Sequence, residues 1–286
     1  MKQKQAETQK LRKEGTGRWL LDGEKFIEWQ DNAGSLWIVG PSGAGKSVLS
    51  SAVINNQLFD DRRLFKDQAD APPAPAVTFF YFDFWSQQGE SVENVLRRMV
   101  LQLSAQSPYL YRALDKLYTL SNGHTLPTYS DLLQVFAQLF QELGRTYIVL
   151  DALDECNKSD LEKLLALVLM LWTWTRTPVH LLMTSQLCCI FAESFADVPS
   201  VTLELNAVQD DIVFFITNGL QTKFSLGIWW PKADLITTRV AQKSKGMFHL
   251  AACLLIKLSH CNWEDELDKT LGNLLDDLFG IYNRFL

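Results

Sequence analysis

The sequence has 286 residues, of which 27 are basic and 33 acidic, giving a formal net charge of −6. A chain of this length can bury a sizeable core, which predicts one α/β domain with a smaller appendage or two modest domains. The negative balance gives no electrostatic reason to expect a nucleic-acid partner. The longest apolar run, 164–172, is shorter than the roughly 18 residues of a membrane span, so no stable membrane insertion is expected.

The amino terminus is polar and locally basic. Residues 1–14 are expected to form a basic leader, which is either a partner-binding arm or, as the favoured alternative, a solvated and partly helical segment. The apolar stretch typical of a secretory signal is missing there, so the expected location is cytoplasmic. The basic residues of this leader are Lys2, Lys4, Lys10, Arg12 and Lys13.

The cysteines are five in number and lack the paired spacing of zinc ligands. An odd number without such spacing also argues against a disulfide framework. We therefore expect reduced, mostly structural cysteines at positions 156, 188, 189, 253 and 261.

Strand patterns alternate with helical patterns along the first two thirds of the chain. Apolar runs predict strands at 36–39, 77–85, 146–151, 179–184 and 201–205. Apolar residues at helical spacing predict helices at 48–54, from Ser91 to Leu103, and at 131–143 between a Ser130 cap and Gly144. The alternation predicts an α/β fold with a mainly parallel sheet of about five strands between helices. After residue 205 only helical patterns remain, which predicts a small helical subdomain over 206–286.

A glycine-rich motif follows the first predicted strand and precedes a predicted helix. It matches G-x-x-x-x-G-K-[ST], the Walker A or P-loop pattern, in the context that this pattern requires. Its glycines let backbone N–H groups approach phosphate oxygens, its lysine neutralises phosphate charge, and its final hydroxyl is suited to ligate Mg²⁺. The sequence therefore predicts a P-loop NTPase fold whose phosphate-binding residues are Gly40, Pro41, Ser42, Gly43, Ala44, Gly45, Lys46 and Ser47.

An acidic cluster directly follows the predicted strand 146–151. Asp151 ends this strand, and a carboxylate at such a position is suited to hold Mg²⁺ beside a phosphate loop, as in a Walker B motif. Water that attacks a γ-phosphate must be oriented and must lose a proton. We predict Glu155 as the first candidate for this role and Asp154 as the second, although acids after a strand are also common at helix starts.

The segment Asn157–Asp160 matches the NKxD pattern of guanine recognition. It directly follows the predicted metal-binding strand, where a purine could hardly reach it, so we interpret the match as a coincidence. Ser159 and Glu162 offer a structural explanation, because together they can form a capping box at a helix start.

With these motifs in place, the chain resembles the NACHT family of STAND signal-transduction NTPases, especially the fungal nephrocystin-like and heterokaryon-incompatibility type. The resemblance implies a nucleotide-binding domain over residues 15–205 and places the segment ahead of the phosphate loop near the base. It also implies signalling in fungal self/non-self recognition or cell death, with protein partners and possible self-association on activation. The likeness is carried by 15–21, Phe26, Trp29, 81–84, Asp151–Glu155 and 243–248.

Gln186 departs from the pattern of this family. The family's sensor strand commonly ends in arginine, whereas Met183-Thr-Ser-Gln186 ends in a neutral amide that cannot offset developing charge. The expected function is binding and slow hydrolysis of a purine nucleoside triphosphate, with ATP favoured over GTP, Mg²⁺ as cofactor, and a switch as the outcome. One alternative is a nucleotide-stabilised interaction module with little hydrolysis. A weaker alternative is a P-loop kinase that acts on a small molecule.

Overall fold

The chain forms two compact units. The computed structural model describes residues 1–64, 74–83, 91–121, 126–203, 205–222 and 224–272. The first unit comprises Met1–Arg12, Leu20–Val39 and Lys46–Thr202, and the second comprises Lys13–Trp19, Gly40–Gly45 and the chain from Leu203 onward.

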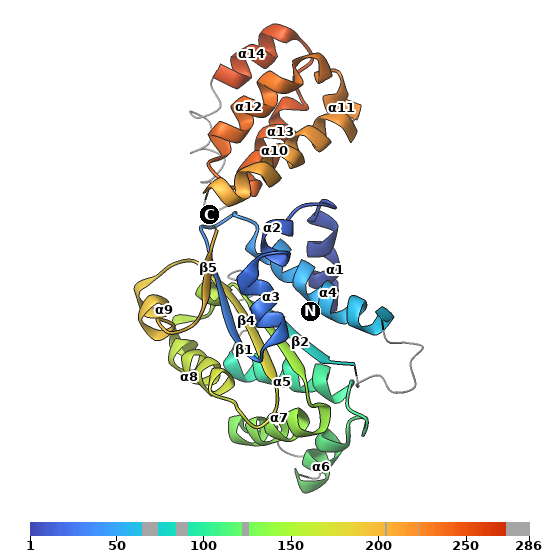
Figure 1. Ribbon diagram of the computed structural model, residues 1–286, viewed down its shortest axis with the longest axis vertical. Coiled ribbons are helices and arrows are strands. Elements are labelled where there is room, and N and C mark those ends of the chain that lie inside the picture. The colour runs from blue at the N-terminus through green and yellow to red at the C-terminus, as the bar shows by residue number, and fades with distance from the viewer. Residues whose placement is uncertain (65–73, 84–90, 122–125, 204, 223, 273–286) are drawn as a thin grey trace. The chain divides into compact units, whose positions relative to one another are not determined.

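A five-stranded parallel sheet forms the centre of the first unit (Figure 1). The order of its strands is β2-β3-β4-β1-β5. All five predicted strand positions and the mainly parallel sheet are confirmed. The last strand is shorter than predicted because helix α10 begins at Leu205. The second strand ends at Tyr81, so the predicted residues 82–83 are not part of it, and the predicted residues 84–85 lie outside the described part of the chain. The strands are β1 (Gly34–Val39), β2 (Ala76–Tyr81), β3 (Thr146–Asp151), β4 (Val179–Ser185) and β5 (Ser200–Thr202).

Helices cover both faces of this sheet (Figure 1), as expected for parallel strands. On one face lie α1 (Lys2–Leu11), α3 (Glu24–Asp31) and α4 (Lys46–Leu64). On the other lie α5 (Val92–Ser104), α7 (Tyr129–Leu143) and α8 (Leu161–Trp172). The shorter elements are α2 (Arg18–Leu21), α6 (Arg112–Ser121), η1 (Leu153–Glu155), η2 (Lys158–Asp160) and α9 (Cys189–Ser194).

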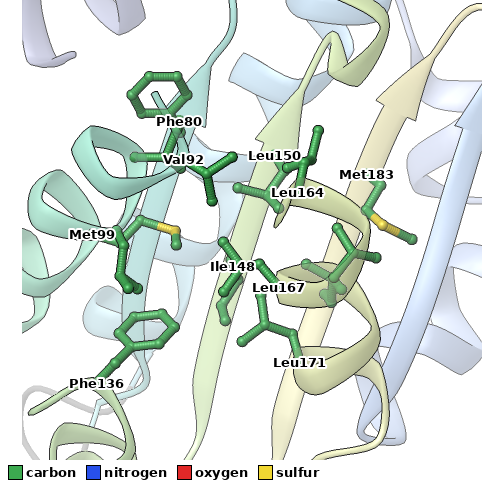
Figure 2. Close-up of a cluster of buried hydrophobic side chains, with 14 of the residues drawn as sticks. Phe80, Val92, Met99, Phe136, Ile148, Leu150, Leu164, Leu167, Leu171 and Met183 are labelled. Carbon is green, nitrogen blue, oxygen red and sulfur yellow. The ribbon is translucent and has the colours of Figure 1, made fainter. Parts of the chain in front are cut away.

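Alternate side chains of the strands belong to opposite faces of the sheet. Ile148 and Leu150 of β3 are fully buried in an apolar core against α5, α7 and α8, and Figure 2 shows side chains from all three helices around them. Tyr147, Val149 and Asp151 therefore belong to the opposite face, which α4 contacts. The aspartate that ends β3 is thus placed next to the helix that follows the phosphate loop.

The helix ends confirm some predicted caps and correct others. Ser91 caps α5 by accepting a hydrogen bond from the backbone of Asn94, and Gly144 ends α7, both as predicted. Thr128, rather than Ser130, caps the start of α7, because α7 begins two residues earlier than predicted and Thr128 forms a capping box with Asp131.

The predicted Ser159–Glu162 capping box is wrong. Ser159 lies inside the 3₁₀ turn η2, so its backbone already has a helical conformation and Asp160 is the residue that precedes α8. The side chain of Asp160 makes no capping hydrogen bond.

The amino-terminal segment is helical, as expected, but it is not a solvated leader throughout. Gln5 and Thr8 of α1 are buried, and α1 packs against α4. The buried residues of α1 are polar, so the helix shows no apolar periodicity in the sequence that could have predicted this contact.

Between Leu205 and Gly272, the described residues of the second unit form helices, which agrees with the small helical subdomain predicted as part of the fold. Its core consists of leucine, isoleucine and valine side chains from several helices, including Ile216, Val240 and Leu254, which are at most 1% exposed. Its elements are α10 (Leu205–Thr222), α11 (Phe224–Gly227), η3 (Trp230–Lys232), α12 (Ala233–Ser244), α13 (Phe248–Leu258) and α14 (Glu264–Gly272).

Candidate functional site

Asp151, at the carboxyl end of β3, is held by hydroxyl groups from two neighbouring elements. The Ser50 hydroxyl of α4 and the Thr184 hydroxyl of β4 both donate to Oδ1 of Asp151, each at 2.7 Å. Asp151 is 1% exposed, so these hydrogen bonds compensate for water that the carboxylate loses on folding. Its position is thereby fixed relative to both α4 and β4.

Ala152 turns the chain sharply after Asp151. It has a left-handed backbone with φ 59° and ψ 53°, which is costly for a residue with a Cβ atom. The Ala152 N–H donates to the Thr184 hydroxyl at 2.9 Å, so the strained turn is tied to β4. This turn leads directly into η1, where Asp154 and Glu155 lie.

Asp154 binds Gln186, the residue that directly follows β4. Its Oδ1 accepts from the backbone N–H of Gln186, and its Oδ2 accepts from the Gln186 side-chain amide, both at 2.9 Å. Both oxygens of the Asp154 carboxylate therefore hold Gln186, one through its backbone and one through its side chain. This geometry suits a positioning role better than transfer of a proton.

Lys46, the first residue of α4, is a buried cation whose charge is influenced by three acidic side chains of the same unit. Burial lowers its pKa, while the charges of Asp154, Asp151 and Glu155 act in the opposite direction. A buried ammonium is costly unless negative charge lies close to it. The first unit thus brings together Lys46 and all three of the predicted acidic residues.

The phosphate loop has the backbone conformations that its glycines were expected to allow. Gly43 and Gly45 have φ values of +75° and +93°, in the region that side chains with Cβ atoms disfavour. The loop packs within the second unit, where His249 N–H of α13 donates to the Gly43 carbonyl at 3.4 Å. Ser47 follows in α4 and is half-buried.

Sequence reasoning missed Ser50 and Thr184. Ser50 lies one helical turn after Ser47, and Thr184 lies two residues before Gln186, so each had a weak local signal. Their hydrogen bonds to Asp151 span 101 and 33 residues, and only the fold brings these groups together.

The donor set near Asp151 suits a hard cation that retains water and phosphate ligands. Among the described residues, no group of three or more His, Cys, Asp or Glu side chains is arranged to hold a metal ion. Ser47 and Asp151 instead offer a hydroxyl and a carboxylate, the oxygen ligands that Mg²⁺ prefers when a substrate supplies the others. In the same described ranges, none of the helices combines the length and apolar character of a membrane span.

Comparison with known proteins supports the P-loop NTPase fold. The model of a family described as Nephrocystin 3, N-terminal matches residues 15–186, more than half of the chain. The structure of a Walker-type ATPase of Pyrococcus abyssi is similar over 97% of this chain and 80% of its own, with 13% identity and a TM-score of 0.50. Cdc6p from Pyrobaculum aerophilum has a TM-score of 0.48 and 11% identity, over 87% of this chain and 63% of its own. No curated protein matches the chain.

Proposed function

Because this chain belongs to the nephrocystin 3 N-terminal family and has the fold of a P-loop NTPase, we propose that it is a nucleotide-dependent switch of the NACHT/STAND type. It binds a purine nucleoside triphosphate, ATP in preference to GTP, together with Mg²⁺, and hydrolyses it slowly. Residues 15–205 form the proposed nucleotide-binding domain, and residues 206–286 form the helical subdomain that responds to it. The observation that carries the proposal is the buried Lys46 among Asp151, Asp154 and Glu155.

Each of these side chains has a distinct proposed task. Lys46 neutralises charge on the β- and γ-phosphates, and backbone N–H groups of residues 40–45 donate to phosphate oxygens. Ser47 and Asp151 hold Mg²⁺, which when bound offsets the charge that develops on the phosphate oxygens. We expect Oδ2 of Asp151 to be the ligating atom, because both hydroxyl donors occupy Oδ1.

Glu155 is the proposed acceptor of the proton from the attacking water. Asp154 instead positions Gln186 through its two hydrogen bonds. An amide can orient a water molecule but cannot neutralise the transition state as a guanidinium does, which accounts for slow turnover.

The second candidate function is a nucleotide-stabilised interaction module with very little hydrolysis. The neutral Gln186, held by Asp154, favours it. Gln186→Arg supplies the missing cation and should raise turnover several-fold if this position faces the γ-phosphate. An unchanged rate of phosphate release would argue against that role.

Competition binding of ATP, ADP, GTP and GDP in the presence of Mg²⁺ tests the proposed function, and sizing of each complex tests self-association. Lys46→Ala should weaken ATP binding by about 100-fold or more, because the phosphate charge then lacks its counter-charge. Lys10→Ala, which removes an exposed lysine of α1, is the matched control and should bind as the wild type does. Wild-type affinity in Lys46→Ala would refute the proposal.

Glu155→Gln separates binding from hydrolysis. The amide cannot accept the proton, so phosphate release should fall by about 100-fold while ATP remains bound. Asp154→Ala should reduce the rate less, because it releases Gln186 and removes one of the three negative charges near Lys46 but leaves the proposed proton acceptor in place. Phosphate release that is absent already in the wild type would favour the interaction module, and transfer of phosphate to a small molecule would favour a kinase.

A further inference from the structure

Helix α1 binds to the rest of the first unit through polar side chains. Its two buried residues are Gln5 and Thr8, whereas Ala6 and Leu11 are exposed. Within α1 itself, apolar burial therefore contributes little, although Met1, which precedes the helix, packs against the apolar core. Hydrogen bonds of polar side chains are the main contacts of the helix itself.

Gln5 joins α1 to α4, the helix that begins at the phosphate loop. Its amide nitrogen donates to the Ser51 carbonyl at 3.1 Å and to Oδ1 of Asn55 at 3.3 Å. Ser51 directly follows Ser50, which donates to Asp151, and Ser47 lies one turn earlier on the same helix. Gln5 thus contacts α4 at the level of the residues that face the acidic cluster.

Gln5 also joins α1 to the end of β2. Its carbonyl oxygen accepts a hydrogen bond from the Tyr81 hydroxyl, and Tyr81 lies opposite Asp151 in the sheet. Burial and the charge of Asp151 raise the pKa of Tyr81, so the phenol remains a donor. Lys4 adds a contact to the same strand end, through an ion pair with Asp83 at 2.9 Å.

We propose that α1 is a polar strap that fixes α4 against β2, and that Gln5 is a positioning residue for the Ser50–Asp151 contact and hence for the magnesium site. The inference rests on the proposed function, because it assigns Mg²⁺ to Ser47 and Asp151. It differs from that function in naming a residue that contacts neither the nucleotide nor the ion. Gln5 acts only by holding two elements at the distance that the 2.7 Å hydrogen bond requires.

The test is the Mg²⁺ dependence of ATP binding by the full chain. Gln5→Met keeps the length of the side chain but removes its hydrogen bonds. It should raise the Mg²⁺ concentration for half-maximal ATP binding by about 10-fold, the usual scale for loss of an outer contact of a metal site. ATP affinity measured in EDTA should stay within about 2-fold of the wild type. Gln9→Met, at an exposed position of the same helix, is the control and should leave both values unchanged.

Tyr81→Phe gives an independent variant that removes one hydroxyl and keeps the ring. It should shift the Mg²⁺ requirement in the same direction as Gln5→Met, and the double variant should shift it by less than the two single effects together. An unchanged Mg²⁺ requirement in both variants, or an equal shift in Gln9→Met, would overturn the inference while leaving the proposed function intact. A wild-type chain that binds no nucleotide would overturn the proposed function itself.

Discussion

At their carboxyl ends, β3 and β4 hold Asp151 and Thr184 in a set of hydrogen bonds that converges on one carboxylate oxygen. At their amino ends, the same two strands hold Tyr147 and His180, whose rings stack with centroids 4.4 Å apart. Both ends bury polar groups, but the carboxyl ends direct them to a carboxylate and the amino ends place them in stacked rings.

The imidazole at the amino end has a partner on each of its nitrogens. Nδ1 of His180 lies 2.8 Å from the Trp29 carbonyl, and Nε2 accepts from Nε of Arg145 at 3.2 Å. This pattern requires the neutral tautomer with a proton on Nδ1. Burial is the main cause that lowers the pKa of His180 to about 4, and the charge of Arg145 also lowers it.

Under the proposed function, the polar groups at the carboxyl ends take part in nucleotide binding and hydrolysis, whereas those at the amino ends stabilise the fold. At the amino end the hydrogen bonds are completed within an aromatic cluster, so their loss should affect folding. At the carboxyl end the donors fix a carboxylate beside Lys46, so substitutions there should affect binding and turnover more than folding. Three substitutions, taken in order of expected effect, test this division.

Asp151→Asn should have the largest effect on function. The amide oxygen can still accept the two hydroxyl hydrogen bonds, but it lacks the charge that we propose holds Mg²⁺. We expect Mg²⁺-dependent ATP hydrolysis to fall by about 1,000-fold, or about 4 kcal/mol in activation free energy. The free energy of unfolding in urea should change by less than about 1 kcal/mol. A large loss of stability together with full activity would reverse the comparison.

His180 should make the free energy of unfolding depend on pH. Its pKa of about 4 in the folded state lies below the ordinary 6.5, so its contribution is fully present above pH 6.5 and is lost as the pH falls through about 4. This contribution amounts to about 3 kcal/mol. The measurement is urea unfolding at pH 7 and at pH 4. Between these pH values, the free energy of unfolding of His180→Gln should fall by about 3 kcal/mol less than that of the wild type.

His260→Gln, which removes an exposed histidine, is the control for this experiment and should keep the wild-type pH dependence. An equal slope in His180→Gln and wild type would show that His180 is not held neutral in the fold.

Thr184→Val should have the smallest effect, and it should change both the free energy of unfolding and ATP binding. It removes the acceptor of the buried Ala152 N–H and one donor to Asp151, which should cost about 1–3 kcal/mol of unfolding free energy. It should also raise the Mg²⁺ requirement of ATP binding. Thr184→Ser keeps the hydroxyl and should restore that requirement to within about 2-fold of the wild type. If Thr184→Ser did not restore the Mg²⁺ requirement, the hydroxyl of residue 184 would not be the group that sets it.

The strands were predictable because they are apolar runs bounded by breaks in pattern. The residues 146–151 were predicted with the bounds that β3 has, since this run is buried on both faces and ends at a single acid. Caps were harder, because Thr128 and Ser130 are equally good candidates in sequence and the start of α7 decides between them.

Long-range polar contacts left no comparable pattern in the sequence. Gln5 reaches Tyr81 across 76 residues, and Asp154 reaches Gln186 across 32. Asp154 and Glu155 could be nominated together as acids near a strand end, but only the fold distinguishes the one that holds Gln186. Ala152 likewise gave no sign of its left-handed backbone, which alanine rarely adopts.

The assignment of residues to the two units has a practical consequence for protein engineering. The chain passes from one unit to the other after residues 12, 19, 39, 45 and 202. No single cut can therefore release either unit as an intact polypeptide. A fragment ending at residue 202 would keep the sheet but would strip Lys13–Trp19 and Gly40–Gly45 of the residues they pack with. Dissection by truncation would thus damage the phosphate loop, whereas point substitutions leave it in place.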